Sequence, residues 1–81
     1  MNREDLESRL RDIVARRLKL DTPAIGTNAS FMEDLGADSV DVVELLMDFQ
    51  EAFVVTIPDA DAEGLGRFDL ALDYLAAKLG L

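Results

Sequence analysis

The chain has 81 residues, enough for one small domain with a modest hydrophobic core. It contains no cysteine and no histidine, which excludes disulfides, thiolate chemistry and zinc sites with imidazole ligands. Seventeen Asp and Glu against eight Lys and Arg give a net charge of −9, which disfavours nucleic acid as a partner. No apolar run is long enough to span a membrane, so we expect no membrane insertion.

The acidic charge is concentrated in the middle of the chain. Between Leu20 and Gly66 there are eleven acidic residues and no Lys or Arg. A basic protein surface is the natural complement of such a field. The N-terminal residues M-N-R-E-D-L-E include no signal-peptide h-region. We therefore expect a complete, monomeric cytoplasmic protein with a single domain over residues 1–81 and protein partners that carry basic patches.

The first predicted element is an amphipathic helix over about residues 3–18, where apolar residues recur at helical spacing. The segment from Lys19 to Asp38 contains Pro23, Gly26 and Gly36 and is predicted to be a long loop. Within it, residues 30–33 (S-F-M-E) have the spacing of a capping box, which predicts a short helical turn. We expect three apolar side chains to anchor this turn to the core: Phe31, Met32 and Leu35.

A second long helix is predicted from Asp38, a good N-cap, to about Phe53. Residues 54–57 (V-V-T-I) are all β-branched but have no partner strand, so we expect an extended connection whose apolar side chains pack inward. A short helical turn follows over residues 59–65, and the last helix runs from about Phe68 to Gly80. The predicted fold is all-α: a small bundle of three main helices plus one short helix, with a long loop between the first two main helices.

A helical wheel of the second helix has three faces where an ordinary amphipathic helix has two. The core stripe contains Val42, Leu45, Leu46, Phe49 and Phe53. A row of acids contains Asp41, Glu44, Asp48 and Glu51. A second apolar row contains Val40, Val43 and Met47. Because acids at this spacing with no base nearby repel one another, we interpret the acidic row and its apolar neighbours as a surface for partner docking. The alternative is a merely solvated acidic face, with Val43 and Met47 packed under the long loop.

Ser39 stands directly after the N-cap of this helix and has three possible roles: part of the cap, nucleophile or attachment point. No side chain that could activate it as a nucleophile is evident in the sequence. A helix N-terminus favours phosphate through its N–H groups and dipole, and Gly36 and Ala37 keep the approach uncrowded.

The segment F-M-E-D-L-G-A-D-S-V-D-V-V-E-L-L-M-D-F, residues 31–49, closely resembles the acyl carrier protein signature. I-P-D-A-D-A-E (residues 57–63) and D-Y-L (residues 73–75) match the downstream family pattern, so the resemblance covers essentially the whole chain. It implies a carrier without enzymatic activity that holds acyl chains as thioesters on a covalent 4′-phosphopantetheine arm. The arm would be attached to Ser39, beside Asp38, by a phosphopantetheinyl transferase.

The same resemblance implies two surfaces. Ketosynthases, acyltransferases and other acyl-processing enzymes with basic patches would dock on Val40, Asp41, Glu44, Met47, Asp48 and Glu51. The acyl chain would lie among Phe31, Val43, Leu46, Met47, Ile57, Ala62 and Leu65. Val40 stands where Leu is commoner, Gln50 where fatty-acid carriers often have Glu, and Thr56 where an acid is frequent. These departures leave two interpretations open: fatty acid biosynthesis, or a dedicated polyketide or specialised lipid pathway.

Two other classes of function are weaker. Residues 59–64 (D-A-D-A-E-G) begin like a calcium-binding EF-hand loop, but Leu70 stands where the loop needs its bidentate Glu, so we expect no metal site. A free-standing enzyme without His or Cys would need a pair of carboxylates in a cleft. The carboxylates are instead predicted to form an exposed row, so we expect no catalytic residues.

Overall fold

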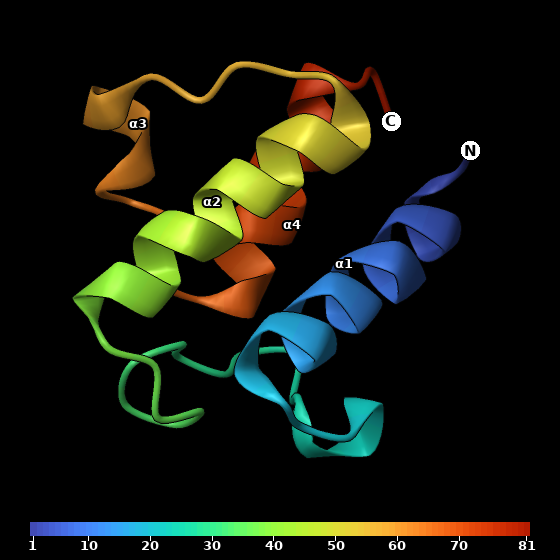
Figure 1. Cartoon of the computed structure of the whole chain (residues 1–81). Coiled ribbons are helices and arrows are strands. Elements are labelled where there is room, and N and C mark those ends of the chain that lie inside the picture. The colour runs from blue at the N-terminus through green and yellow to red at the C-terminus, as the bar shows by residue number, and fades with distance from the viewer.

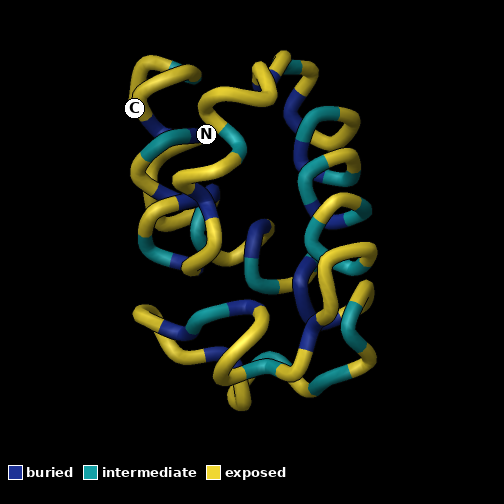
Figure 2. Tube along the Cα trace, turned by 90° about the vertical axis from the view of Figure 1, so that its left-hand side faces the viewer, coloured by how far each residue is buried: buried dark blue, intermediate teal, exposed yellow.

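Four α-helices and one 3-10 turn form the fold in the computed structural model, which describes residues 1–81. The elements are α1 (Arg3–Leu18), η1 (Thr22–Ala24), α2 (Ser39–Phe53), α3 (Asp59–Ala62) and α4 (Phe68–Lys78). Figure 1 shows α2 crossing in front of α4 with α1 alongside, and Figures 1 and 2 place the two termini near each other. The predicted all-α class, with three main helices and a short one, is confirmed. No helix has both the length and the apolar character needed to cross a membrane.

The core is entirely apolar and is built from one stripe of each long helix together with side chains of the connecting loops, as Figure 2 shows by the dark inner side of the tube. The largest fully buried side chains are Phe31, Phe49, Phe68, Leu6, Leu10, Leu45, Leu75 and Val14. The rings of Phe31 and Phe49 meet with their centroids 6.5 Å apart, a normal distance for a favourable aromatic pair. This contact fixes the loop before α2 against the middle of α2 itself.

Helix α1 follows its predicted boundaries and is tied to the rest of the molecule by its arginines. Its N-cap is a reciprocal capping box between Asn2 and Asp5. Arg11 donates from Nε to the carbonyl oxygen of Ile25 at 3.0 Å, and its guanidinium lies 4.7 Å from the centroid of the Phe68 ring. One arginine of α1 thereby contacts both the long loop and the start of α4.

The loop between α1 and α2 contains the predicted turn, with two corrections. Ser30 Oγ accepts from the Glu33 N–H as expected, but the carboxylate that accepts from the Ser30 N–H is Asp34, at 2.7 Å. Phe31 is buried, whereas the Met32 side chain is 52% exposed and does not anchor the turn. Backbone hydrogen bonds from Phe31 to Gly66 and from Phe68 to Ala29 fasten the loop to the start of α4.

The connection after α2 differs from the prediction at Val54. This residue is the C-cap of α2 in the left-handed region, with φ of 53°, and it is 90% exposed. The cap geometry turns its side chain outward, while Ile57 is buried as expected. Gln50 explains part of this turn: its amide donates to the Leu46 carbonyl and accepts from the Ile57 N–H. A Glu at this position could accept but not donate when ionised.

Candidate functional site

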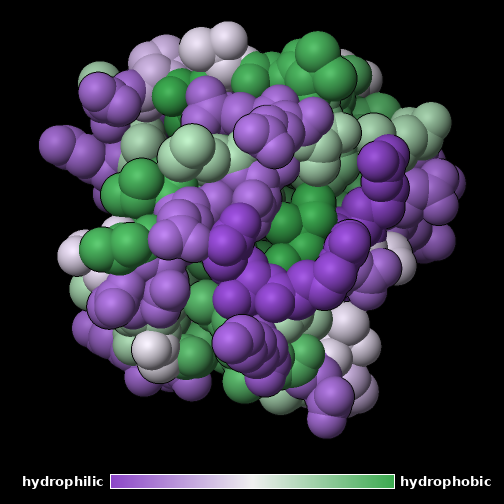
Figure 3. All heavy atoms as spheres, viewed as in Figure 1, coloured by the Kyte–Doolittle hydropathy of each residue, from purple (hydrophilic) through white to green (hydrophobic).

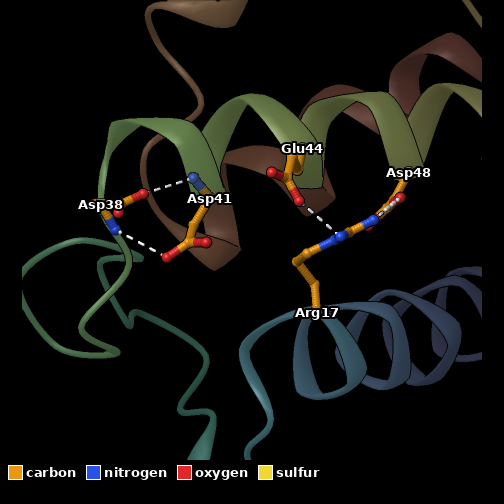
Figure 4. Close-up of polar contacts among 5 residues, drawn as sticks. All are labelled: Arg17, Asp38, Asp41, Glu44 and Asp48. Atoms are coloured by element: carbon orange, nitrogen blue, oxygen red, sulfur yellow. Dashed lines mark hydrogen bonds and ion pairs between the residues drawn. The ribbon is translucent and has the colours of Figure 1, made fainter.

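The first turn of α2 is closed by two aspartates rather than by the serine between them. Asp38 Oδ1 accepts from the Asp41 N–H at 2.8 Å, and Asp41 Oδ2 accepts from the Asp38 N–H at 3.2 Å (Figure 4). This is a reciprocal capping box with Asp in the position usually held by Glu or Gln. Ser39 is the first helical residue, is exposed, and its hydroxyl has no hydrogen-bond partner within the chain. The prediction that Asp38 takes the cap role is confirmed.

The backbone before Ser39 turns sharply and leaves space beside the helix start. Gly36 has φ of 74°, a conformation that disfavours residues with a side chain, and a Cβ placed there meets nothing within 4 Å. Ala37 is buried and donates its N–H to the carbonyl of Phe31 at 2.8 Å. The two small residues therefore have different roles. Ala37 packs in the core and holds the turn in place, whereas Gly36 adopts the left-handed conformation and leaves the space beside Ser39 open.

The apolar row of α2 faces outward. The exposed fractions are 61% for Val40, 56% for Val43 and 53% for Met47. The alternative that Val43 and Met47 pack under the long loop is therefore wrong. Figure 3, viewed from the side of α2, shows exposed hydrophobic groups among the hydrophilic ones.

The acidic row of α2 does have a base nearby, which corrects the sequence prediction. Arg17, in the last turn of α1, donates from Nε and Nη2 to the two carboxylate oxygens of Asp48 at 2.7 and 2.8 Å. Its Nη1 donates to Glu44 Oε2 at 2.7 Å, so one guanidinium bridges two acids (Figure 4). The hydrogen bond to Asp48 is the main reason why the pKa of Arg17 is raised. Glu51, at the end of the row, is exposed and makes no ion pair.

The residues expected around an acyl chain divide between core and surface. Phe31, Ile57 and Leu65 are buried, Leu46 and Ala62 are half-buried, and Val43 and Met47 are exposed. The structure has an open pocket of about 560 Å³ elsewhere, between α1 and α2. It is lined by Ile13, Arg16, Arg17, Lys19, Asp48, Glu51 and Ala52. Figure 3 shows strongly hydrophilic side chains around a hollow in this region, with hydrophobic atoms at its base.

The segment that begins like an EF-hand loop is folded differently. Residues Asp59–Ala62 form α3, and the Asp61 carboxylate accepts a hydrogen bond from the Tyr74 hydroxyl at 2.6 Å. No three carboxylates of the chain are placed to hold a metal ion together. The geometry of this segment is that of a short helix attached to α4.

A family model described as a phosphopantetheine attachment site matches residues 8–67. The chain belongs to this family. The resemblance to acyl carrier proteins found in the sequence is thereby confirmed, and the covalent group of such domains is 4′-phosphopantetheine. The family implies a carrier that interacts with a phosphopantetheinyl transferase and with acyl-processing enzymes. The start of α2 fits this group chemically, because an exposed hydroxyl stands outside the cap hydrogen bonds, at a helix end that favours phosphate.

Proposed function

We propose that Ser39 carries the 4′-phosphopantetheine and that the chain holds acyl groups as thioesters and delivers them to partner enzymes. The observation that carries this proposal is the exposed Ser39 hydroxyl at the start of α2, left outside the cap by Asp38. The matched range contains two other serines. Ser8 lies inside α1, beyond its first turn, and so does not stand at a helix N-terminus. Ser30 Oγ already accepts a hydrogen bond from the Glu33 N–H.

Attachment joins Ser39 Oγ to the phosphorus of the phosphopantetheinyl group of coenzyme A, while a bond of the pyrophosphate breaks and the nucleotide leaves. The hydroxyl proton needs a base, and the two neighbouring carboxylates, Asp38 and Asp41, are engaged in the cap. Each of these carboxylates commits one oxygen to the cap, and we propose that the separate transferase supplies the base. The attached group supplies a terminal thiol, which is the chemistry that acyl transfer needs and that a chain without cysteine lacks.

We further propose that partner enzymes dock on α2. Three kinds of observation support this: Val40 and Met47 exposed on the helix that begins at Ser39, the acids of the same helix, and the strongly negative middle of the chain. The contact residues proposed are Val40, Asp41, Glu44, Met47, Asp48 and Glu51. The acyl chain would enter between the helices near half-buried Leu46 and Ala62, next to buried Phe31, Ile57 and Leu65, with Val43 and Met47 at the entrance.

The pathway proposed first is fatty acid biosynthesis, with the chain acting as a cytoplasmic monomer. A dedicated polyketide or specialised lipid carrier is the second candidate. Val40 favours it, because this less common residue is 61% exposed directly beside Ser39, where a partner would read it. The mass of the protein isolated from its native host separates the two, because it reports the acyl cargo on the arm.

The test of attachment is intact mass spectrometry after incubation with coenzyme A and a broad-specificity phosphopantetheinyl transferase. We expect the mass to increase by one phosphopantetheinyl group in the natural chain and not in Ser39→Ala. An unchanged mass of the natural chain, with the transferase active on a control carrier, would contradict the proposal.

A further inference from the structure

Arg17 occupies the middle of the surface on which partners are proposed to dock. It engages both carboxylate oxygens of Asp48 and one oxygen of Glu44 (Figure 4). Both acids belong to α2, whereas Arg17 belongs to α1, so the contact also ties the two helices together. The carboxylate oxygens left without a partner in this row belong to Glu51 and to the outer sides of Glu44 and Asp41.

We propose that Arg17 is a specificity-determining residue that competes, within the chain, with the basic side chains of partner enzymes for Glu44 and Asp48. The inference rests on the proposed docking of partners on α2. A partner that uses only the apolar row and the unoccupied carboxylates binds without disturbing Arg17. A partner that reaches Asp48 must first displace it.

The exposure of the three side chains makes such displacement feasible. The exposed fractions are 36% for Arg17, 42% for Glu44 and 27% for Asp48, so solvent and a partner can reach the contact. Exposed ion pairs are weak because water and salt screen them. Paired guanidinium–carboxylate hydrogen bonds are the strongest contacts of this kind, so displacement costs little net free energy only for an incoming side chain that reproduces them.

The geometry also selects the kind of partner. Two parallel N–H donors of a planar guanidinium bind the two oxygens of Asp48, an arrangement that a lysine ammonium cannot reproduce. A partner arginine can replace Arg17 at Asp48 with equivalent hydrogen bonds, whereas a partner lysine replaces two bonds with a point charge. The surface thus favours partners that present arginine to the middle of α2.

The neighbouring Arg16 provides a matched control. It precedes Arg17 in the same last turn of α1 and lines the same pocket, but it is exposed and makes no ion pair. Arg16→Gln and Arg17→Gln change the net charge equally. Any difference between the two variants therefore reports the contact with Glu44 and Asp48 and not the overall field.

The experiment measures KM and kcat for the apo chain as substrate of a broad-specificity phosphopantetheinyl transferase with coenzyme A. We expect Arg17→Gln to lower KM by about two- to fivefold relative to Arg16→Gln, with kcat unchanged. This is the size expected when the partner no longer has to break an exposed ion pair before it binds. Adding Glu44→Gln and Asp48→Asn to Arg17→Gln should remove this gain. Equal KM values for the two single variants, or a gain that survives the added substitutions, would overturn the proposal.

Folding and the proposed function are controlled separately. Arg17→Lys keeps the charge but loses the paired donors, so its KM should lie between those of the natural chain and Arg17→Gln. A KM for Arg17→Lys equal to that of the natural chain would count against the proposal, and circular dichroism verifies that each variant is helical. If the natural chain is not modified at all, the proposed function fails; if it is modified and Arg17→Gln behaves like Arg16→Gln, only the role of Arg17 fails.

Discussion

The Tyr74 hydroxyl donates a hydrogen bond to the Asp61 carboxylate at 2.6 Å and fastens α3 to α4. Helix α3 has only four residues, and no side chain caps its N-terminus. Such a short helix has little stability of its own, so its position depends on contacts with neighbouring elements. In the function proposed above, the acyl chain would lie beside this segment, which makes the contact relevant to the carrier.

The first prediction concerns the ionisation of Tyr74. Its hydrogen bond to the carboxylate, followed by desolvation and the charge of Asp61, raises the pKa of Tyr74 to about 12. Because the folded pKa is raised, the stabilisation is fully present below pH about 10 and is lost as pH rises through about 12. The chain has one Tyr and no Trp, so phenolate absorbance reports this residue alone. Asp61→Asn should return the titration toward its ordinary range; a titration near pH 10 in the natural chain would contradict the contact.

The second prediction concerns the cap of α2. Asp38→Ala removes the acceptor for the Asp41 N–H and should lower the free energy of unfolding by about 1 kcal/mol, measured by urea denaturation. Asp21→Ala is the matched control, because Asp21 is an exposed aspartate at an N-cap whose side chain makes no cap hydrogen bond. Equal losses in the two variants would mean that the capping box contributes nothing specific.

The third prediction uses the unusual backbone of Val54. A β-branched residue with φ of 53° is strained, and its side chain is 90% exposed, so it contributes little packing. Val54→Gly should therefore stabilise the fold by about 0.5–1 kcal/mol, after the entropy of glycine in the unfolded chain is included. Val55→Gly, at the half-buried neighbour with ordinary φ, should destabilise it. A loss of stability in both variants would exclude strain at Val54.

Much of this fold follows from local sequence patterns. Apolar spacing predicted the boundaries of α1 and α2 closely, and the cap at Asp38 was predicted as well, because both signals act within a few residues. The helical wheel placed Val40 and Val43 away from the core stripe for the same reason, but it left open that Val43 packs under the long loop, and the structure shows it exposed. Sequence patterns of this kind predict a helical fold well, because helix hydrogen bonds and caps join residues only three or four positions apart.

The features that escaped prediction depend on packing or on backbone geometry. Arg17 is 27 and 31 residues from its two partners, so its position depends on how α1 lies against α2. The available signal was a first helix with five arginines, followed by a second helix that has acids and no base. Val54 was misplaced because the β-branched residues 54–57 resemble an extended segment, whereas the end of α2 imposes a left-handed cap there.

The most direct test of the central claim locates the modification among the chain's three serines. Ser8→Ala, Ser30→Ala and Ser39→Ala are each incubated with coenzyme A and the transferase, and the modified residue is located by peptide fragmentation. We predict that the arm lies on Ser39 in the natural chain and that only Ser39→Ala escapes modification. Modification at another residue, or addition that survives Ser39→Ala, would contradict the account.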